Sequence, residues 1–463
     1  MIKNAGINIK LLVRWTIHAV VAGVSGVLIV HSFDWALTFL PAYRGAPLIH
    51  PLADAVIAAA VAGLILYRIA PGAAGEGIPA YLDAIRDGDG SLPFLDTLIK
   101  YPAALLALGF WGSGGMVGPL GRVTAGLSQA VTVQLQRVFP VFLSDQEGIS
   151  GHYSAPTTAA IAGMAAAVAA IFGAPIAGAV FAVEVIQRDQ MRYHQLFPAI
   201  LASSTAVLFM KTAGWNPPFV VVVPAYAPEA FALVPIVIVG IASGFMGWFF
   251  VTLYRVMAYL FRRRRTRGRI YRLVIGMTAA AAIGMLVQDH IFGTSTRISL
   301  LLSMGDFRSL SVSWLAGNGV VLLLVLMTAK LLTNCLTVSS GMSAGLTGPA
   351  ALIGMFVGAV IALLFGYEAG GYTYTALVAA GFAGTLASTV NIPLAASILV
   401  MEVFAPEFGL PAGVSAILGF QIARHSTIHE EALENRRAEA ALRARVRQKR
   451  MDGPQPHRRR RFR

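Results

Sequence analysis

The sequence contains few charged residues, and long stretches of it contain none. Only 13% of its 463 residues are Asp, Glu, Lys or Arg, about half the share of a typical soluble domain. Hydrophobic residues make up 56% of the chain and form runs at 53–70, 155–183, 234–250 and 350–364. Runs of this length are long enough to cross a lipid bilayer. The composition argues against a soluble protein and predicts an integral membrane protein.

Cysteine is almost absent, since Cys335 is the only one. A single cysteine excludes a disulfide within the chain, and no Cys or His cluster has the spacing of a metal site. The neighbours of Cys335 are mostly apolar, which indicates a buried small side chain rather than a redox centre. We therefore expect neither a metal nor another cofactor.

The charge that is present is mainly positive and unevenly placed. The net charge is +14, with basic residues near the start, in a run over 262–269 and densely over 436–463. Positive segments beside membrane helices tend to stay in the cytoplasm, so we expect both termini to lie in the cytoplasm. The expected location of the protein is the bacterial inner (plasma) membrane. A basic tail of this kind favours anionic lipid head groups as its partner, and no nucleic acid is expected.

Glycine and proline are abundant, with 47 and 23 residues. Both break helices, and lipid tolerates broken helices only where protein or a cavity covers the backbone. We therefore predict many short, tilted or interrupted helices rather than a simple up-and-down bundle.

Two motifs occur twice, in the same order. Residues 115–119 and 345–349 both read G-x-x-G-P, and 175–184 and 393–402 share their proline, an alanine and the final glutamate at the same spacing. The two halves of the chain are therefore predicted to be copies. Halves duplicated around broken segments are typical of transporters with a site at the repeat interface.

These repeats predict the organisation of the chain. Glu184 and Glu402 occupy matching places, so we expect them to bind neighbouring helix ends rather than to act in transport. The expected units are a first membrane repeat over 1–261, a basic linker over 262–269, a second membrane repeat over 270–427, and a basic cytoplasmic tail over 428–463.

Three Gly- and Pro-rich breaks, at 75–79, 112–119 and 341–349, each precede a helix-compatible run. A helix start offers free N–H groups and the positive end of the helix dipole. Several such starts that converge bind an anion without a full lysine or arginine charge. Because an ion in transit must bind and also leave, the pattern predicts an anion pathway.

These motifs, with Phe172–Pro175 between them, resemble in content and order the CLC family of chloride channels and chloride/proton antiporters. The resemblance covers most of the chain. It implies an all-α membrane protein of two inverted repeats with tilted and broken helices, and a homodimer with one pore per subunit. Chloride is the expected anion, while bicarbonate, nitrate and fluoride stay open.

The chain departs from the family where the family places its proton chemistry. Val117 stands in place of the gating glutamate, and Val185 in place of the second proton glutamate of the antiporters. With both carboxylates absent, the resemblance implies an uncoupled, channel-like pathway. A chloride/proton antiporter that uses Glu76 and His429 is the alternative.

Glu76 stands in the central anion motif, where most family members have a serine, and His429 in place of the pore tyrosine. A carboxylate at this position repels an anion unless it is protonated, paired or turned away. Three roles for Glu76 stay open. It is a relocated gate, a partner of His429 that makes transport pH-dependent, or a member of a structural hydrogen-bond network.

The resemblance also assigns the residues around the pathway. Glu76 and Val117 are the gate candidates. Lys100 and Arg122 flank the first G-x-x-G-P motif and either add positive potential at a pore mouth or snorkel to the membrane surface. The implied pathway residues are Glu76, Gly77, Ile78, Gly115, Met116, Val117, Gly118, Gly345, Leu346, Thr347, Gly348 and His429.

An intramembrane serine protease is the enzyme alternative. Residues 23–26 read G-x-S-G, with Ser25 as the nucleophile and His152 as its base. Among 47 glycines such a tetrapeptide arises easily by chance, and Ser25 precedes the repeated motifs. We therefore expect no enzyme.

Overall fold

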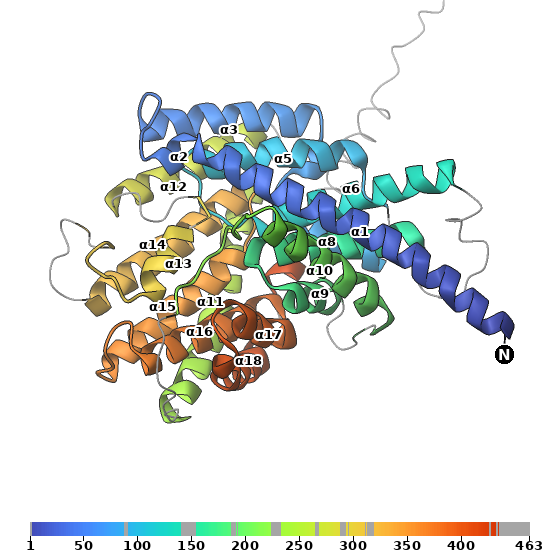
Figure 1. Cartoon of the computed structure of the whole chain (residues 1–463). Coiled ribbons are helices and arrows are strands. Elements are labelled where there is room, and N and C mark those ends of the chain that lie inside the picture. Colours follow the sequence, from blue (N-terminus) through green and yellow to red (C-terminus); the bar gives the residue numbers. More distant parts are fainter. Residues whose placement is uncertain are drawn as a thin grey trace, which may run out of the picture.

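The protein is a bundle of helices of very different lengths (Figure 1). The computed structural model describes residues 2–87, 91–139, 154–186, 191, 193–223, 233–263, 268–287, 293–294, 296–310, 312, 319–425, 427–431 and 434. These residues form helices and turns, with two isolated bridges and no strand. The prediction of an all-α protein is confirmed.

The helices fall into long and short groups. The longer ones are α1 (Ile2–Thr38), α3 (Pro51–Arg68), α5 (Phe94–Gly109), α6 (Val117–Val138), α8 (Ala155–Phe172), α10 (Leu196–Thr212), α11 (Leu233–Arg263), α12 (Arg269–Leu286), α14 (Gly319–Ser340), α15 (Thr347–Leu364), α16 (Tyr372–Val390) and α18 (Gly409–Ala423). The shorter ones are α2 (Pro41–Arg44), α4 (Ile78–Leu82), α9 (Pro175–Glu184), α13 (Thr296–Ser303) and α17 (Pro393–Val403), with the single turns η1 (Pro71–Ala73), η2 (Asp83–Asp87), η3 (Tyr193–Gln195) and η5 (Pro406–Phe408).

Eight of the described helices are long and apolar enough to cross a membrane: α1 from Val13, α3, α8, α11, α12, α14, α15 and α16. The apolar windows of α8 and α16 are 94% buried inside the protein, whereas those of α3 and α12 are 39% buried. Helices buried on all sides make an inner layer, and the others present apolar side chains outward, as lipid requires. The prediction of an integral membrane protein is confirmed.

Close helix contacts depend on glycine. A Cβ atom on Gly354 of α15 would lie 2.1 Å from the carbonyl oxygen of Gly381 on α16, and the reverse holds for Gly381. Small residues that let two backbones touch are the usual device of helix packing in membranes. This explains how the inner helices pack so closely.

The two halves end and restart their helices alike. α8 ends at Gly173 and α16 at Asn391, with φ angles of 68° and 67°. This left-handed conformation stops a helix. Pro175 and Pro393 then occupy the first turns of α9 and α17, where proline fits best. These two helices have 10 and 11 residues, so the predicted interrupted helices are confirmed.

Hydrogen bonds exchanged between the halves are reciprocal. The Gly115 N–H donates to the Gly345 carbonyl and the Gly345 N–H to the Gly115 carbonyl, both at 2.7 Å. The Glu184 carboxylate accepts from the amides of Leu394 and Ala395 at the start of α17. In return, the Glu402 carboxylate accepts from those of Ile176 and Ala177 at the start of α9. Such reciprocity indicates a two-fold relation between the copies, and the capping role predicted for both glutamates is confirmed.

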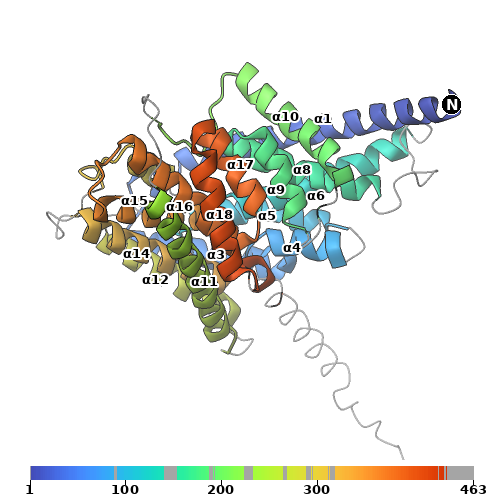
Figure 2. The same cartoon turned by 90° about the horizontal axis from the view of Figure 1, so that it is seen from below.

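The arrangement in space follows this division. α9 contacts α17, so the two short helices meet across the halves. Figures 1 and 2 show α14, α15 and α16 gathered on one side of the molecule and α1, α6 and α8 on the other. α11 ends at Arg263 and α12 begins at Arg269, and residues 264–267 and 435–463 lie outside the described residues. The domain boundaries, the cytoplasmic placing of both termini, the lipid contact of the tail and the absence of a nucleic-acid partner therefore stay predictions.

Cys335 and Ser25 are both held within helices. Cys335 is fully buried on α14, as expected. The Ser25 hydroxyl donates to the carbonyl of Ala22 on its own helix α1 and lies 3.5 Å from the Ser128 hydroxyl. His152, the base of the protease alternative, lies outside the described residues.

Candidate anion site

The three predicted Gly-rich breaks meet at one place inside the protein. The Gly75 N–H donates to the carbonyl of Gly341 at 2.9 Å, which joins the first break to the third. A Cβ on Gly77 would lie 1.9 Å from the Gly118 carbonyl oxygen, so only glycine fits where the first break touches the second. The reciprocal Gly115–Gly345 bonds join the second break to the third. The starts of α4, α6 and α15 therefore converge.

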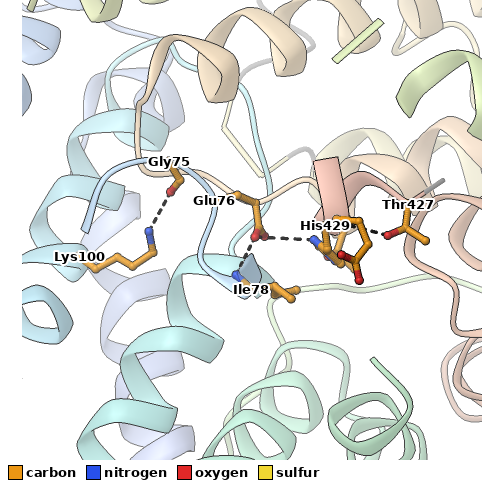
Figure 3. A network of polar contacts seen from close by, with 8 residues as sticks. Gly75, Glu76, Ile78, Lys100, Thr427 and His429 are labelled. Atoms are coloured by element: carbon orange, nitrogen blue, oxygen red, sulfur yellow. Dashed lines mark hydrogen bonds and ion pairs between the residues drawn. The ribbon is translucent and has the colours of Figure 1, made fainter. Parts of the chain in front are cut away.

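The carboxylate of Glu76 lies at this point of convergence (Figure 3). Its side chain is fully buried, and Oε2 accepts a hydrogen bond of 2.6 Å from the Ile78 N–H at the start of α4. A Cβ on Gly118 would lie 2.0 Å from Oε1, so this oxygen rests against the start of α6. The backbone N–H of Leu346, just before the start of α15, is another hydrogen-bonding group beside the carboxylate. The carboxyl group thus occupies the place where converging helix starts would bind an anion.

His429 faces the carboxylate from the opposite side to Lys100 (Figure 3). It lies in the helical turn at 427–431, after α18, and its Nδ1 lies 3.7 Å from Glu76 Oε2. Its Nε2 lies 3.5 Å from the Thr347 hydroxyl at the start of α15. The Nδ1 distance is too long for a direct hydrogen bond, but a protonated imidazole there would pair with the carboxylate. Glu76, Thr347 and His429 therefore come together, as the resemblance implied.

Val117, the other gate candidate, is the first residue of α6 and is buried. It offers no ionisable group, and its neighbour Gly118 is the residue that touches Glu76. The carboxylate therefore reaches the loop in which the family's gate is missing. The other expected pathway residues are also buried, apart from the half-buried Gly348, and their role in transport stays a prediction.

Lys100 and Arg122 are buried, so the snorkelling alternative is wrong. The Lys100 Nζ donates to the carbonyls of Ala73 and Gly75, at 3.0 and 2.8 Å, and its charge acts on Glu76. The Arg122 guanidinium donates to the Thr97 hydroxyl at 2.6 Å. Both side chains donate hydrogen bonds to acceptors inside the protein, and these bonds satisfy their buried polar groups without an extended conformation toward the membrane surface. Lys100 holds the loop that carries Glu76.

A polar cluster that no sequence motif indicated lies behind the second break. Lys330 on α14 is fully buried and donates to the Ser113 hydroxyl at 2.7 Å and to the Gly293 carbonyl at 3.3 Å. The Ser113 hydroxyl in turn donates to Asn334 Oδ1. A lysine within an apolar membrane helix costs free energy and therefore marks a candidate functional residue. Lys330 stands in such a helix, so the sequence could have indicated it.

Comparison with known proteins agrees with this geometry. The family model of the voltage gated chloride channels matches residues 58–424. The chain is 28% identical to the H(+)/Cl(-) exchange transporter ClcA of Vibrio cholerae over 385 residues, which cover 80% of this chain and 75% of the relative. It is 25% identical to the chloride/fluoride channel protein of Pseudomonas syringae pv. tomato over 273 residues, which cover 58% of this chain and 56% of the relative.

A solved structure shares the fold. The crystal structure of a slow cyanobacterial Cl-/H+ antiporter superposes with a TM-score of 0.73 at 20% identity, covering 92% of this chain and 98% of that one. The duplicated motifs, the exchanged caps and the family match over most of the chain agree with one another. The chain therefore belongs to the voltage gated chloride channel family, the CLC family of anion transport proteins.

Proposed function

We propose that the protein conducts chloride through an uncoupled pathway in which the Glu76 carboxylate is the gate. One observation supports this proposal above the others. The carboxylate lies where the starts of α4, α6 and α15 converge, while the family's gate position holds Val117. An anion that enters this place must displace the carboxylate or find it neutral. The family relation supports anion transport, and the gate is our inference from the site.

The charges around Glu76 determine how the gate responds to pH. Lys100 faces it from α5 and His429 from the turn 427–431, while the Arg122 guanidinium on α6 donates to the Thr97 hydroxyl. Protonation of Glu76 removes the negative charge that competes with chloride, whereas burial disfavours the charged form of the His429 imidazole. Loss of the charge on Glu76 favours the anion. We therefore expect chloride flux to rise as the pH falls.

Chloride efflux from liposomes tests the gate. Wild type, Glu76→Gln and Glu76→Ser are compared at steps between pH 5 and pH 8, the range in which such switches act. Glu76→Gln keeps the size and removes the charge, so its flux is expected to be high and independent of Glu76 titration. Glu76→Ser restores the residue typical of the family. Identical pH profiles in the three proteins would reject Glu76 as a gate and leave it a structural hydrogen-bond partner.

A chloride/proton antiporter is the second candidate, and the 3.7 Å approach of His429 to Glu76 favours it. Two titratable groups side by side are able to pass a proton. In that mechanism Glu76→Gln abolishes proton movement coupled to chloride, which is measured as acidification or alkalinisation driven by a chloride gradient alone. An uncoupled pathway gives no such proton movement in the wild type.

The anion and the assembly belong to the same proposal. We take chloride as the anion and test fluoride, nitrate and bicarbonate in parallel, because one relative is named a chloride/fluoride channel protein. We also propose a homodimer with one pathway in each protomer, as the family relation suggests.

A further inference from the structure

We infer that an ion pair between Arg86 and Glu430 clamps the gate by fixing His429 against Glu76. This inference rests on the proposed function, since it assigns a positioning role beside the same carboxylate. Arg86 Nη1 and Nη2 donate to the two carboxylate oxygens of Glu430 at 2.6 and 3.2 Å. Such a bidentate pair fixes direction as well as distance.

Each partner of the ion pair is joined by a short stretch of chain to one partner of the gate. Glu430 follows His429 directly. Arg86 lies in the π-helical turn η2, which continues α4, and α4 begins two residues after Glu76. The two segments therefore approach each other twice, at Glu76 with His429 and at Arg86 with Glu430. The ion pair closes this arrangement at the end away from the carboxylate.

Both segments are positioned by more than the hydrogen bonds of a long helix. α4 has five residues and continues directly into the π-helical turn η2. In the segment 427–431, the Thr427 hydroxyl accepts from the Glu430 N–H, and the Thr427 carbonyl accepts from the Glu431 N–H. Short helical segments depend on contacts with their surroundings. The side-chain pair between Arg86 and Glu430 therefore influences where His429 lies.

A second ion pair anchors the same turn from another side. Arg255 on the membrane helix α11 donates to the Glu431 carboxylate. Neighbouring glutamates of one turn thus bind two different elements: Glu431 binds the long helix α11, and Glu430 binds the segment that carries Glu76. The Arg255 pair places the turn on the bundle, and the Arg86 pair sets its distance from the gate. The side chains of Arg86 and Glu430 are 22% and 20% exposed, so salt weakens their attraction only in part.

Charge reversal in the full-length protein tests the clamp. The variants are Arg86→Glu, Glu430→Arg and the double reversal, with Arg86→Lys as the conservative change. Lys211→Glu and Glu368→Arg alter exposed charges elsewhere and serve as matched controls. The two readouts are hydrogen exchange in the peptide that covers 427–431 and chloride flux as a function of pH.

We expect each single reversal to speed exchange in 427–431 and to change the flux about fivefold, with a flatter pH profile, because two like charges replace an attractive pair. The double reversal restores both readouts, and the controls leave them unchanged. Glu76, Lys100 and Arg122 are present in every variant, so a change in the profile reports the position of His429.

Two results overturn the inference in distinguishable ways. If exchange in 427–431 is unchanged by Arg86→Glu while Glu76→Gln still alters the pH profile, the clamp is wrong and the gate stands. If exchange rises but Glu76→Gln behaves as wild type, the proposed gate is wrong and the clamp has no transport role.

Discussion

At the scale of single residues, two glycines determine the geometry of the site, because the missing side chains allow close contacts. Gly77 lets the first Gly-rich break touch the backbone of α6, and Gly118 leaves the space that Glu76 Oε1 occupies. The Glu76 carboxylate thus accepts from the Ile78 N–H, lies beside the Leu346 amide, and packs against a backbone without a side chain.

Gly118→Ala should push the gate out of its place. The added Cβ would lie 2.0 Å from Glu76 Oε1, and the nearest atom outside Glu76, the Gly345 Cα, is 3.3 Å away. The flexible carboxylate therefore moves before the backbone does. We expect chloride flux near pH 8 to rise about fivefold, since a larger fraction of the sites is open to the anion.

The control for this variant is Gly413→Ala on α18, where an added Cβ meets nothing within 4 Å. It should leave the flux unchanged. In a Glu76→Ala background Gly118→Ala should add no further effect, because there is no carboxylate to displace. An unaltered pH profile in the single variant would show that the carboxylate does not obstruct the pathway at Gly118.

At the scale of the helices, the caps exchanged by Glu184 and Glu402 join the two halves. Each carboxylate binds two free amides at the start of the opposite short helix, where the helix dipole adds to the attraction. α9 and α17 are too short to be stable alone. The caps therefore stabilise both helices and the contact between the halves.

Removal of either cap should destabilise the protein to a similar degree. We expect Glu184→Ala and Glu402→Ala each to lower the free energy of unfolding by about 1–2 kcal/mol, as the loss of a helix cap does. Glu→Gln at either position should cost less, because the amide oxygen still accepts. Thermal unfolding in detergent measures both effects. A loss confined to one glutamate would contradict the two-fold relation, and a loss of flux without a change in Tm would point to a transport role instead.

Much at this scale was predictable from the sequence. The matching segments 175–184 and 393–402, each from a proline to a glutamate, indicated that the halves are copies, and the many glycines and prolines indicated short, interrupted helices. The Arg86–Glu430 pair was not predictable, because its partners lie 344 residues apart in the chain and no periodic pattern joins them. The snorkelling alternative for Lys100 failed for a related reason: the carbonyls that bind it belong to a loop whose course depends on the whole fold. Glu76 was singled out because it breaks the motif, but its contact with Gly118 required the structure.

At the scale of the whole molecule, the two halves form a single buried centre. Inner helices α8 and α16, one from each half, are almost wholly enclosed, and the three Gly-rich breaks meet where the halves touch. At this centre Glu76 lies between Lys100 and His429. Whether a proton accompanies the anion through this point distinguishes a channel from an antiporter.

The reversal potential under crossed chloride and pH gradients tests the central claim most directly. Purified protein in a planar bilayer is given a fixed chloride gradient while the pH difference across the membrane is varied. An uncoupled pathway gated by Glu76 predicts a reversal potential that follows the chloride gradient alone, although the size of the current changes with pH. A reversal potential that moves systematically with the pH gradient would show that protons are coupled to the anion and would contradict the account.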